Sequence, residues 1–220
     1  MKVEWSTFWP RIIQATGETV TMVLFTLIFA TVIGLAIGLL LFVTRKGNIL
    51  ENRFVFLTLN LLINIIRPIP FIIFLVALSP FTRLIMGTTI GTAAAVLPMT
   101  IAASFAVARV VENNLVSIDP GIIEAAQAMG ASPVQIIFTV LIPEALGPLI
   151  LGITFITVGL IDFSAMAGTV GGGGLGDLAM TYGYQRFDTS VMLVTVVILI
   201  LLVQVAQFIG NFLSRLFLRR

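Results

Sequence analysis

DPGIIEAAQAMGASPVQIIFTVLIP, residues 119–143, is the stretch that decides the fold, because it is a polar island between long apolar runs. Asp119-Pro120 predicts a helix start, since the carboxylate caps free N–H groups and proline suits the first helical position. Gly130 is placed to close that helix, and Ser132-Pro133-Val134-Gln135 has the pattern of a second start with a capping box. The segment therefore predicts two short capped helices joined by a sharp turn, and Pro143 is expected to interrupt the chain after the second helix.

The first of these two helices has an apolar face. Ile122, Ile123, Ala126 and Met129 recur with helical spacing, so they lie on one side of it. Such a face needs a cover, either from the chain itself or from a partner. We therefore expect a docking module at this place rather than a separate domain.

The surrounding chain is too apolar for a soluble globule. It has 220 residues, of which 59% are hydrophobic and 10% charged, and its mean hydropathy is +1.14. Residues 20–43, 87–108 and 189–214 contain no charged side chain, and each run exceeds the roughly 20 residues that cross a bilayer. We predict an all-α, polytopic membrane protein forming one domain over residues 1–220. The first run is longer than a signal-peptide core, so we expect it to be retained.

Composition also removes several function classes. The chain has no cysteine and no histidine, which excludes disulfides, catalytic thiols and histidine chemistry, and we expect no metal ligands. No catalytic residue is predicted, because there is also no GxSxG motif and no close carboxylate pair. The phosphate-binding pattern GxxxxGK[ST] is absent, so this chain is not expected to bind ATP in that way. A net charge of +2 gives no reason to expect nucleic acid as a partner.

The second span, beginning near Phe54, is polar on one side and broken. Asn60, Asn64 and Arg67 fall at i, i+4 and i+7 on one helical face. Arg67-Pro68-Ile69-Pro70 then breaks the helix, because proline lacks a donor and disfavours helix in the preceding residue. Two interpretations stay open: a proline kink with amide hydrogen bonds to a neighbouring span, or a wall of a translocation path.

The fourth span, expected to start after Pro143 and Glu144, carries a second intramembrane charge. Asp162 and Arg67 are both predicted in the outer half of the membrane, where they pair with each other or with a zwitterionic solute, or else reach the outer surface separately. Met166, among small residues, is a candidate for narrowing the mouth of a path or for filling a gap in the core. The candidate path residues are Asn64, Arg67, Pro68, Pro70, Asp162, Ser164 and Met166.

The remaining stretches give local expectations. Residues 1–18 hold interfacial aromatic side chains and predict a short surface helix before the first span. Gly34 and Gly38 form a GxxxG pattern, which indicates a close helix crossing within the chain or at a dimer seam. Residues 79–87 are expected to form a loop. The last span carries a polar stripe that predicts interhelical hydrogen bonds, formed by Gln204, Gln207 and Asn211.

Five spans place the two termini on opposite sides of the membrane. The positive-inside rule favours an external N-terminus and a cytoplasmic C-terminus, because that arrangement puts seven cations inside and four outside. Five helices are few for enclosing a polar route, so we expect two copies related by a two-fold axis. The inner set is Arg45, Lys46, Arg53, Arg109, Arg215, Arg219 and Arg220, and the outer set is Lys2, Arg11, Arg83 and Arg186.

The polar island resembles the EAA loop of ABC-importer permeases. The match consists of Glu124-Ala125-Ala126, then Gly130, then Val140-Leu141-Ile142-Pro143, with conservative departures at Val140 and Ile142. Nearly the whole chain is also similar to the five-span methionine importer permeases. That likeness is carried, in order, by residues 34–45, by Asn64-Ile65-Ile66-Arg67-Pro68-Ile69-Pro70-Phe71, by Ala108-Arg109-Val110-Val111-Glu112, by Gly172-Gly173-Gly174-Leu175-Gly176 and by Tyr182-Gly183-Tyr184. Asp162 departs from the neutral small residue expected there.

The resemblance implies a type I ABC importer permease of a bacterial inner membrane. It implies a homodimer, two cytoplasmic ATPase subunits that hold ATP and Mg²⁺, and an extracytoplasmic solute-binding protein. Residues 117–143 would be the cytoplasmic coupling segment, with Glu124, Ala125, Ala126, Gly130, Ala131, Ser132 and Pro143 as the ATPase-coupling residues. The implied function is methionine import. Another amino acid or small zwitterion, and a passive channel, are the alternatives.

Overall fold

The computed structural model describes residues 5–218, and within that range it is built from helices with no β-strand. Helix α1 (Trp5–Val43) is one unbroken helix of 39 residues. At 1.5 Å per residue it is about 58 Å long, so part of it lies outside a hydrocarbon core about 30 Å thick. The prediction of a separate surface helix in residues 1–18 is therefore wrong for the described part, and residues 1–4 lie outside the described range.

Glu18 and Thr19, where the surface helix was expected to give way to the first span, contact a distant segment. Glu18 Oε2 accepts a hydrogen bond of 2.8 Å from Gly174 N, and Thr19 Oγ1 accepts one of 2.9 Å from Leu175 N. Both contacts attach the helix α9 (Gly174–Leu178) to the side of α1. A polar pair inside a helix thus serves a distant segment, and periodicity alone does not show this.

The second span is broken where the prolines predict it. Helix α2 (Arg53–Ile66) and helix α3 (Phe71–Ala77) are bent by 106° across the turn that contains Pro68 and Pro70. The loop predicted over residues 79–87 is instead the helix α4 (Ser79–Met86). Pro80 lies in its first turn, where the missing donor costs nothing, and Gly87 ends it with a left-handed φ of +74°.

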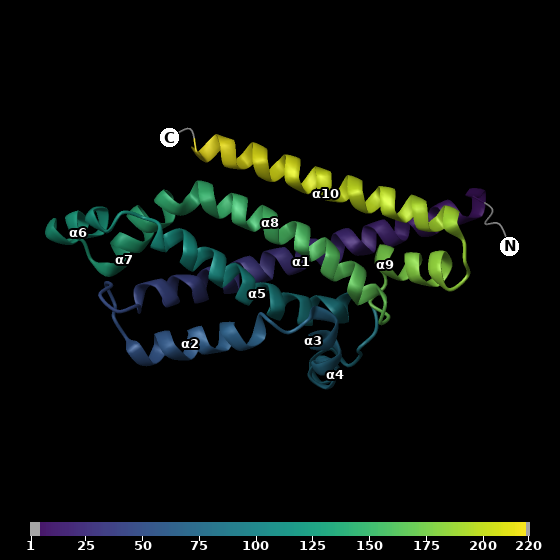
Figure 1. Cartoon of the computed structure of the whole chain (residues 1–220), viewed down its shortest axis with the longest axis horizontal. Coiled ribbons are helices and arrows are strands. Elements are labelled where there is room, and N and C mark those ends of the chain that lie inside the picture. The colour runs from purple at the N-terminus through teal and green to yellow at the C-terminus, as the bar shows by residue number, and fades with distance from the viewer. Residues whose placement is uncertain (1–4, 219–220) are drawn as a thin grey trace.

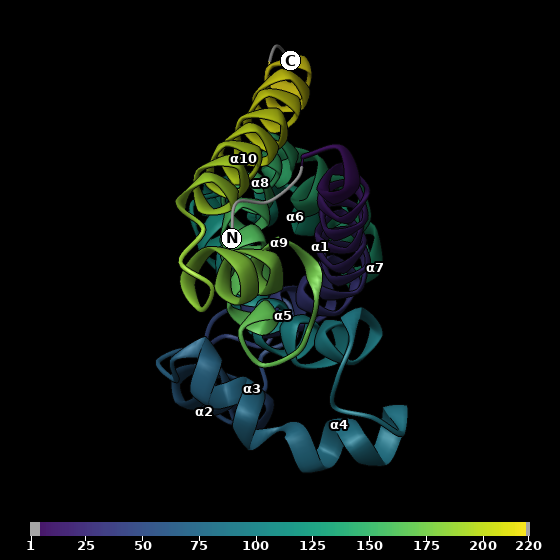
Figure 2. The ribbon, with the colours of Figure 1, turned by 90° about the vertical axis from the view of Figure 1, so that its right-hand side faces the viewer.

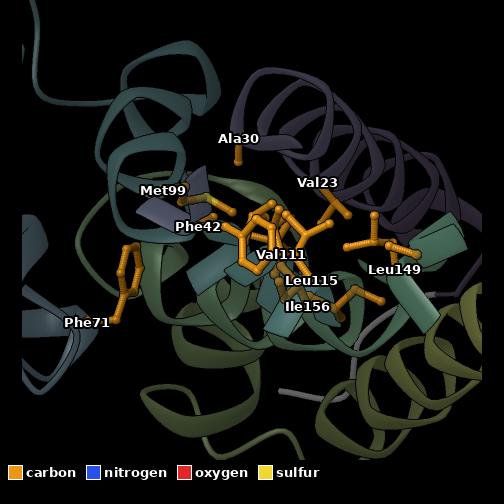
Figure 3. Close-up of a cluster of buried hydrophobic side chains, with 14 of the residues drawn as sticks. Val23, Ala30, Phe42, Phe71, Met99, Val111, Leu115, Leu149 and Ile156 are labelled. Carbon is orange, nitrogen blue, oxygen red and sulfur yellow. The ribbon is translucent and has the colours of Figure 1, made fainter. Parts of the chain in front are cut away.

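Helix α5 (Thr92–Val116) lies at the centre of the molecule, between α1 and the helix α8 (Ile142–Gly168). Helix α10 (Thr189–Leu218) runs along one side of this group, and α2, α3 and α4 lie on the opposite side (Figures 1 and 2). Side chains of α1, α5 and α8 converge around Val111 and Leu115, both buried (Figure 3).

The GxxxG pattern of α1 marks its crossing with α5. A Cβ added at Gly34 would lie 2.4 Å from the Cβ of Val107, and one added at Gly38 would lie 2.6 Å from the carbonyl oxygen of Ala108. Real Cβ atoms do not come this close, so only glycine permits the observed helix separation. The small residues therefore serve packing within the chain.

Pro143 does not separate the coupling segment from the fourth span, contrary to the prediction. The helix α7 (Pro133–Ile136), the π-helix η1 (Ile137–Leu141) and α8 follow one another without a break. In the wide π turn, Ile142 N bonds to Ile137 O, five residues back. This turn accommodates Pro143, which has no donor of its own, so the chain continues as helix.

Four described helices or helical runs are long and apolar enough to cross a membrane, or five if the bent pair α2 and α3 counts as one span. This agrees with the predicted number by length and composition. The helix α6 (Pro120–Ala128) and α7 lie at one end of the molecule, whereas α9, the π-helix η2 (Ala179–Tyr184) and the start of α10 lie at the other (Figure 1).

Candidate coupling segment and translocation surface

Helix α6 begins and ends as the sequence predicts. Asp119 caps it, because its Oδ1 accepts a hydrogen bond of 2.8 Å from Gly121 N. Gly130 follows the helix with a left-handed φ of +81°, and Ala131 N closes the turn with a bond of 3.1 Å to Ala126 O. This is the backbone pattern of a glycine helix end, so the turn depends on the residue type at position 130.

Helix α7 begins with the predicted capping box. Gln135 N donates to Ser132 Oγ at 3.3 Å, and Ser132 N donates to Gln135 Oε1 at 2.8 Å. Two free N–H groups are satisfied in this way, and Pro133 occupies the first turn. The start of α7 is thus fixed by contacts among neighbouring residues.

The coupling segment is covered by the chain on one side only. Ala126 and Ile136 are buried, with 4% and 1% of their surfaces exposed, and both belong to the main apolar core. Glu124, Ala125, Gly130 and Ser132 are exposed, and Ala131 is half-buried. Of the predicted apolar face, Ala126 and Ile123 are covered by the chain, whereas Ile122 and Met129 are exposed.

Large apolar side chains remain uncovered on this segment. Met129 is 82% exposed, Val134 is 63% exposed and Phe138 is 65% exposed. Val134 and Phe138 belong to the run Pro133–Gly168, which is long and apolar enough to cross a membrane. Met129 lies before that run, and an uncovered apolar side chain there, next to polar ones, is typical of a surface that binds another protein.

The predicted path residues fall into two groups. Arg67, Pro68, Pro70 and Asp162 are exposed, and Met166 is 36% exposed. Ser164 is buried instead, and its hydroxyl donates to Ile161 O at 2.6 Å. It therefore does not line an open surface in this conformation.

Arg67 and Asp162 form no ion pair with each other within residues 5–218. The predicted pairing is therefore absent within one chain. The broken span does pack close to Asp162, because the Phe71 ring of α3 stacks on the ring of Phe163 in α8, with centroids 4.1 Å apart. The two exposed charges are free to face a solute or another subunit.

Asn60 and Asn64 have a partner that the sequence did not reveal. Arg109 Nη2 of α5 donates to both asparagine Oδ1 atoms, each at 2.9 Å, and Arg109 Nη1 pairs with Glu112. Of the two interpretations of the polar stripe, amide hydrogen bonds to a neighbouring span are confirmed for the asparagines. From the sequence, Arg109 was counted as a topological charge and as part of the family likeness, although Glu112 three residues later stands at the spacing of an i, i+3 pair.

The polar stripe of α10 makes no described hydrogen bond within the chain. Gln204 and Asn211 are exposed, and Gln207 is half-buried. The hydrogen bonds predicted between this helix and its neighbours are therefore not formed within residues 5–218.

Similarity to solved structures defines the class of the protein. The chain superposes on a chain of the MetNI methionine ABC transporter, in an inward-facing crystal form, with a TM-score of 0.95 and 43% identity over 98% of this chain and 99% of that one. The fold is therefore that of a type I ABC importer permease. A chain from the crystal structure of an amino acid ABC transporter with histidines shares the fold at 19% identity, with a TM-score of 0.79.

Sequence comparison defines the family. The binding-protein-dependent transport system inner membrane component family matches residues 30–220, and the chain belongs to it. A probable D-methionine transport system permease protein of Vibrio cholerae is 47% identical, over 93% of this chain and 91% of its own length. One from Pasteurella multocida is 48% identical, over 95% of this chain and 96% of its own length.

Proposed function

We propose that this chain is the membrane subunit of an ATP-driven methionine importer, in which two copies form the path and bind two cytoplasmic ATPase subunits. The observation that carries the proposal is the agreement in fold with the methionine transporter over nearly the whole of both chains. Permeases named for D-methionine transport, 47% and 48% identical, support the same solute. The chain itself supplies no catalytic group, and ATP and Mg²⁺ bind to the separate ATPase.

The coupling segment, residues 117–143, contacts the ATPase. Its exposed Met129 and Val134 offer apolar contacts, while Glu124 and Ala125 are exposed beside them. Ala126 and Ile136 fasten the segment to the core of the chain, so movement of the ATPases displaces the permease as a rigid body. The remaining residues, Gly130, Ala131, Ser132 and Pro143, set the course of the chain.

The path lies between the two copies. Arg67, directly after α2, and Asp162 of α8 are both exposed, and a charge in the membrane costs about 2.5 kcal/mol or more. Irregular backbone such as the turn of Pro68 and Pro70 is tolerated at membrane depth only beside protein or water. Asn64 and Met166 contribute to the same wall, whereas Ser164 supports it from behind.

The protein lies in the bacterial inner membrane with its N-terminus outside. The coupling segment then faces the cytoplasm, and α9 with the start of α10 faces a solute-binding protein outside. Two cations at this end support that partner: Arg11 donates a hydrogen bond to the Tyr182 hydroxyl, and the Arg186 guanidinium lies 4.4 Å from the Tyr182 ring centroid.

Reconstitution of the complex tests the proposal. The permease, expressed with its ATPase and binding protein, is placed in liposomes, and ATP hydrolysis and uptake are measured across a panel of amino acids. We expect methionine to stimulate both. Stimulation by another amino acid or a small zwitterion, but not by methionine, would show that methionine is not the transported solute. Solute flux without ATPase would instead indicate a passive channel.

A further inference from the structure

Helix α2 packs on the rest of the chain through one narrow apolar strip, in which Phe56, Leu59 and Ile66 are partly buried. Ile63 is its one buried residue, and it packs in a small cluster with Leu41 of α1 and Ala108 of α5. Leu57 and Leu61 of the same helix are exposed. The polar contacts of α2 therefore act together with this narrow apolar strip in setting the position of the helix.

Those polar contacts converge on a single side chain. Arg109 Nη2 donates to the Oδ1 atoms of Asn60 and Asn64, one turn apart on α2, at 2.9 Å each. Its other terminal nitrogen, Nη1, pairs with Glu112, whose side chain is 6% exposed, while that of Arg109 is 18% exposed. The orientation of this shielded guanidinium is fixed, because the group is planar and its two terminal nitrogens bond to Glu112 on one side and to the two asparagines on the other.

Helix α5, which carries Arg109, leads straight into the coupling segment. Three residues separate Val116, the end of α5, from Pro120, the start of α6. Leu115 and Ile118 are buried in the same core as Ala126 of α6. A displacement of the coupling segment therefore moves the inner end of α5.

Helix α2 connects the contacts of Arg109 to the proposed path. It runs into the turn with Arg67, where the proposed path lies, and α3 beyond the turn is stacked on α8 through Phe71 and Phe163. Among the described residues, only Arg109 makes side-chain hydrogen bonds between α2 and another helix.

From this arrangement we propose that Arg109 is a positioning residue that makes α2 follow α5, so that movement of the coupling segment reaches the path wall around Arg67. The inference rests on the proposed function. Asn60 and Asn64 are the acceptors of this connection. Glu112 orients the guanidinium toward them and balances its charge.

Distance changes between labels separate transmission from simple stability. The chain has no cysteine, so Leu57→Cys on α2 and Val116→Cys at the end of α5, both exposed, are labelled one at a time in otherwise native sequence. Spin-label distances between the two copies are measured in the reconstituted complex, without nucleotide and with ADP and vanadate. In the wild type both distances change.

The test variant is Asn60→Leu with Asn64→Leu, which keeps side-chain size and removes both acceptors. We expect the change at position 116 to persist and the change at position 57 to fall below about half, with solute transported per ATP hydrolysed reduced about fivefold or more. Asn60→Leu alone leaves the Asn64 acceptor in place and should give an intermediate change at position 57. Thr58→Val removes an exposed hydroxyl from the same helix and should leave both label distances and transport per ATP unchanged.

An unchanged response at position 57 in the leucine variant would overturn the inference. The single variant Asn64→Leu, at an exposed position, gives the same comparison if the double variant is not recovered in the membrane. Failure of the wild type to change at position 116 would contradict the proposed function itself. The two failures are thus distinguished by which label remains still.

Discussion

Gly130→Ala tests whether the turn between α6 and α7 sets the geometry of ATPase coupling. Gly130 has a φ of +81°, and a Cβ built there meets no atom within 4 Å. Steric crowding therefore plays no part, and the cost comes from the backbone alone. Holding an alanine in the left-handed region costs about 1–2 kcal/mol.

That cost is comparable with the roughly 0.5–1.5 kcal/mol that one hydrogen bond contributes to stability. If the backbone relaxes out of the left-handed region, Ala131 N loses its bond to Ala126 O, and α7 leaves at a different angle. A free-energy difference of about 1–2 kcal/mol changes an equilibrium by a factor of about 5–30. We expect the affinity of the permease for its ATPase, and the rate of ATP-driven uptake, each to decrease by a factor of about 5–30.

The assay is titration of the purified ATPase against permease in nanodiscs, followed by uptake measurements in liposomes. Gly130→Asn should lie between the wild type and Gly130→Ala, because asparagine tolerates the left-handed region better. Gly17→Ala is the matched control: it is a helical glycine whose added Cβ also meets nothing within 4 Å, and it should leave affinity unchanged. Wild-type affinity for Gly130→Ala, or a weaker Gly130→Asn, would refute the reasoning.

Three further changes test separate parts of the structure. Gly34→Val should lower the apparent melting temperature in detergent by several degrees, because its Cβ would lie 2.4 Å from that of Val107 and overpacking costs about 1–3 kcal/mol. Gly159→Ala, whose added Cβ meets nothing within 4 Å, is the control, and equal melting temperatures of the two variants would contradict the close crossing of α1 and α5. Asp119→Ala removes the cap of α6, which contributes about 1 kcal/mol to helix stability, and should speed backbone amide exchange in residues 120–123. Hydrogen–deuterium exchange measures this, and an unchanged rate would show that the cap is dispensable. Asp162→Asn should alter uptake with the melting temperature unchanged, since Asp162 is exposed and unpaired within the described chain; unaltered uptake would remove Asp162 from the path.

The two capped helices α6 and α7 could be predicted from the sequence because their determinants are local. Asp119 caps a donor two residues away, and Ser132 and Gln135 satisfy each other across three residues. Gly130 needs only its own backbone angle. Rules for helix ends apply to such contacts wherever the segment lies in the fold.

The predictions failed where a distant contact or a neighbouring turn, rather than the local sequence, decided the structure. The prediction that a surface helix ends near Glu18 was wrong, because α1 continues from Trp5 to Val43. Glu18 accepts a hydrogen bond from Gly174, 156 residues away. Pro143 was expected to break the chain, but the π turn before it absorbs the missing donor. The contact of Arg109 with Asn60 and Asn64 spans 49 and 45 residues, so it depends on the way in which two helices dock.

The exposed polar groups of the membrane helices show what the single chain lacks. Arg67, Asp162, Gln204 and Asn211 are exposed in the described chain, although lipid cannot satisfy their hydrogen bonds. Arg109 and Glu112 show the opposite solution, since their charges pair inside one chain. Intramembrane polar groups without an internal partner need water or protein beside them. By this argument the proposed path wall and the stripe on α10 face a second copy or a water-filled route. The contacts of Arg109 with Asn60, Asn64 and Glu112 are instead complete within the chain, as the proposed transmission of movement from α5 to α2 requires.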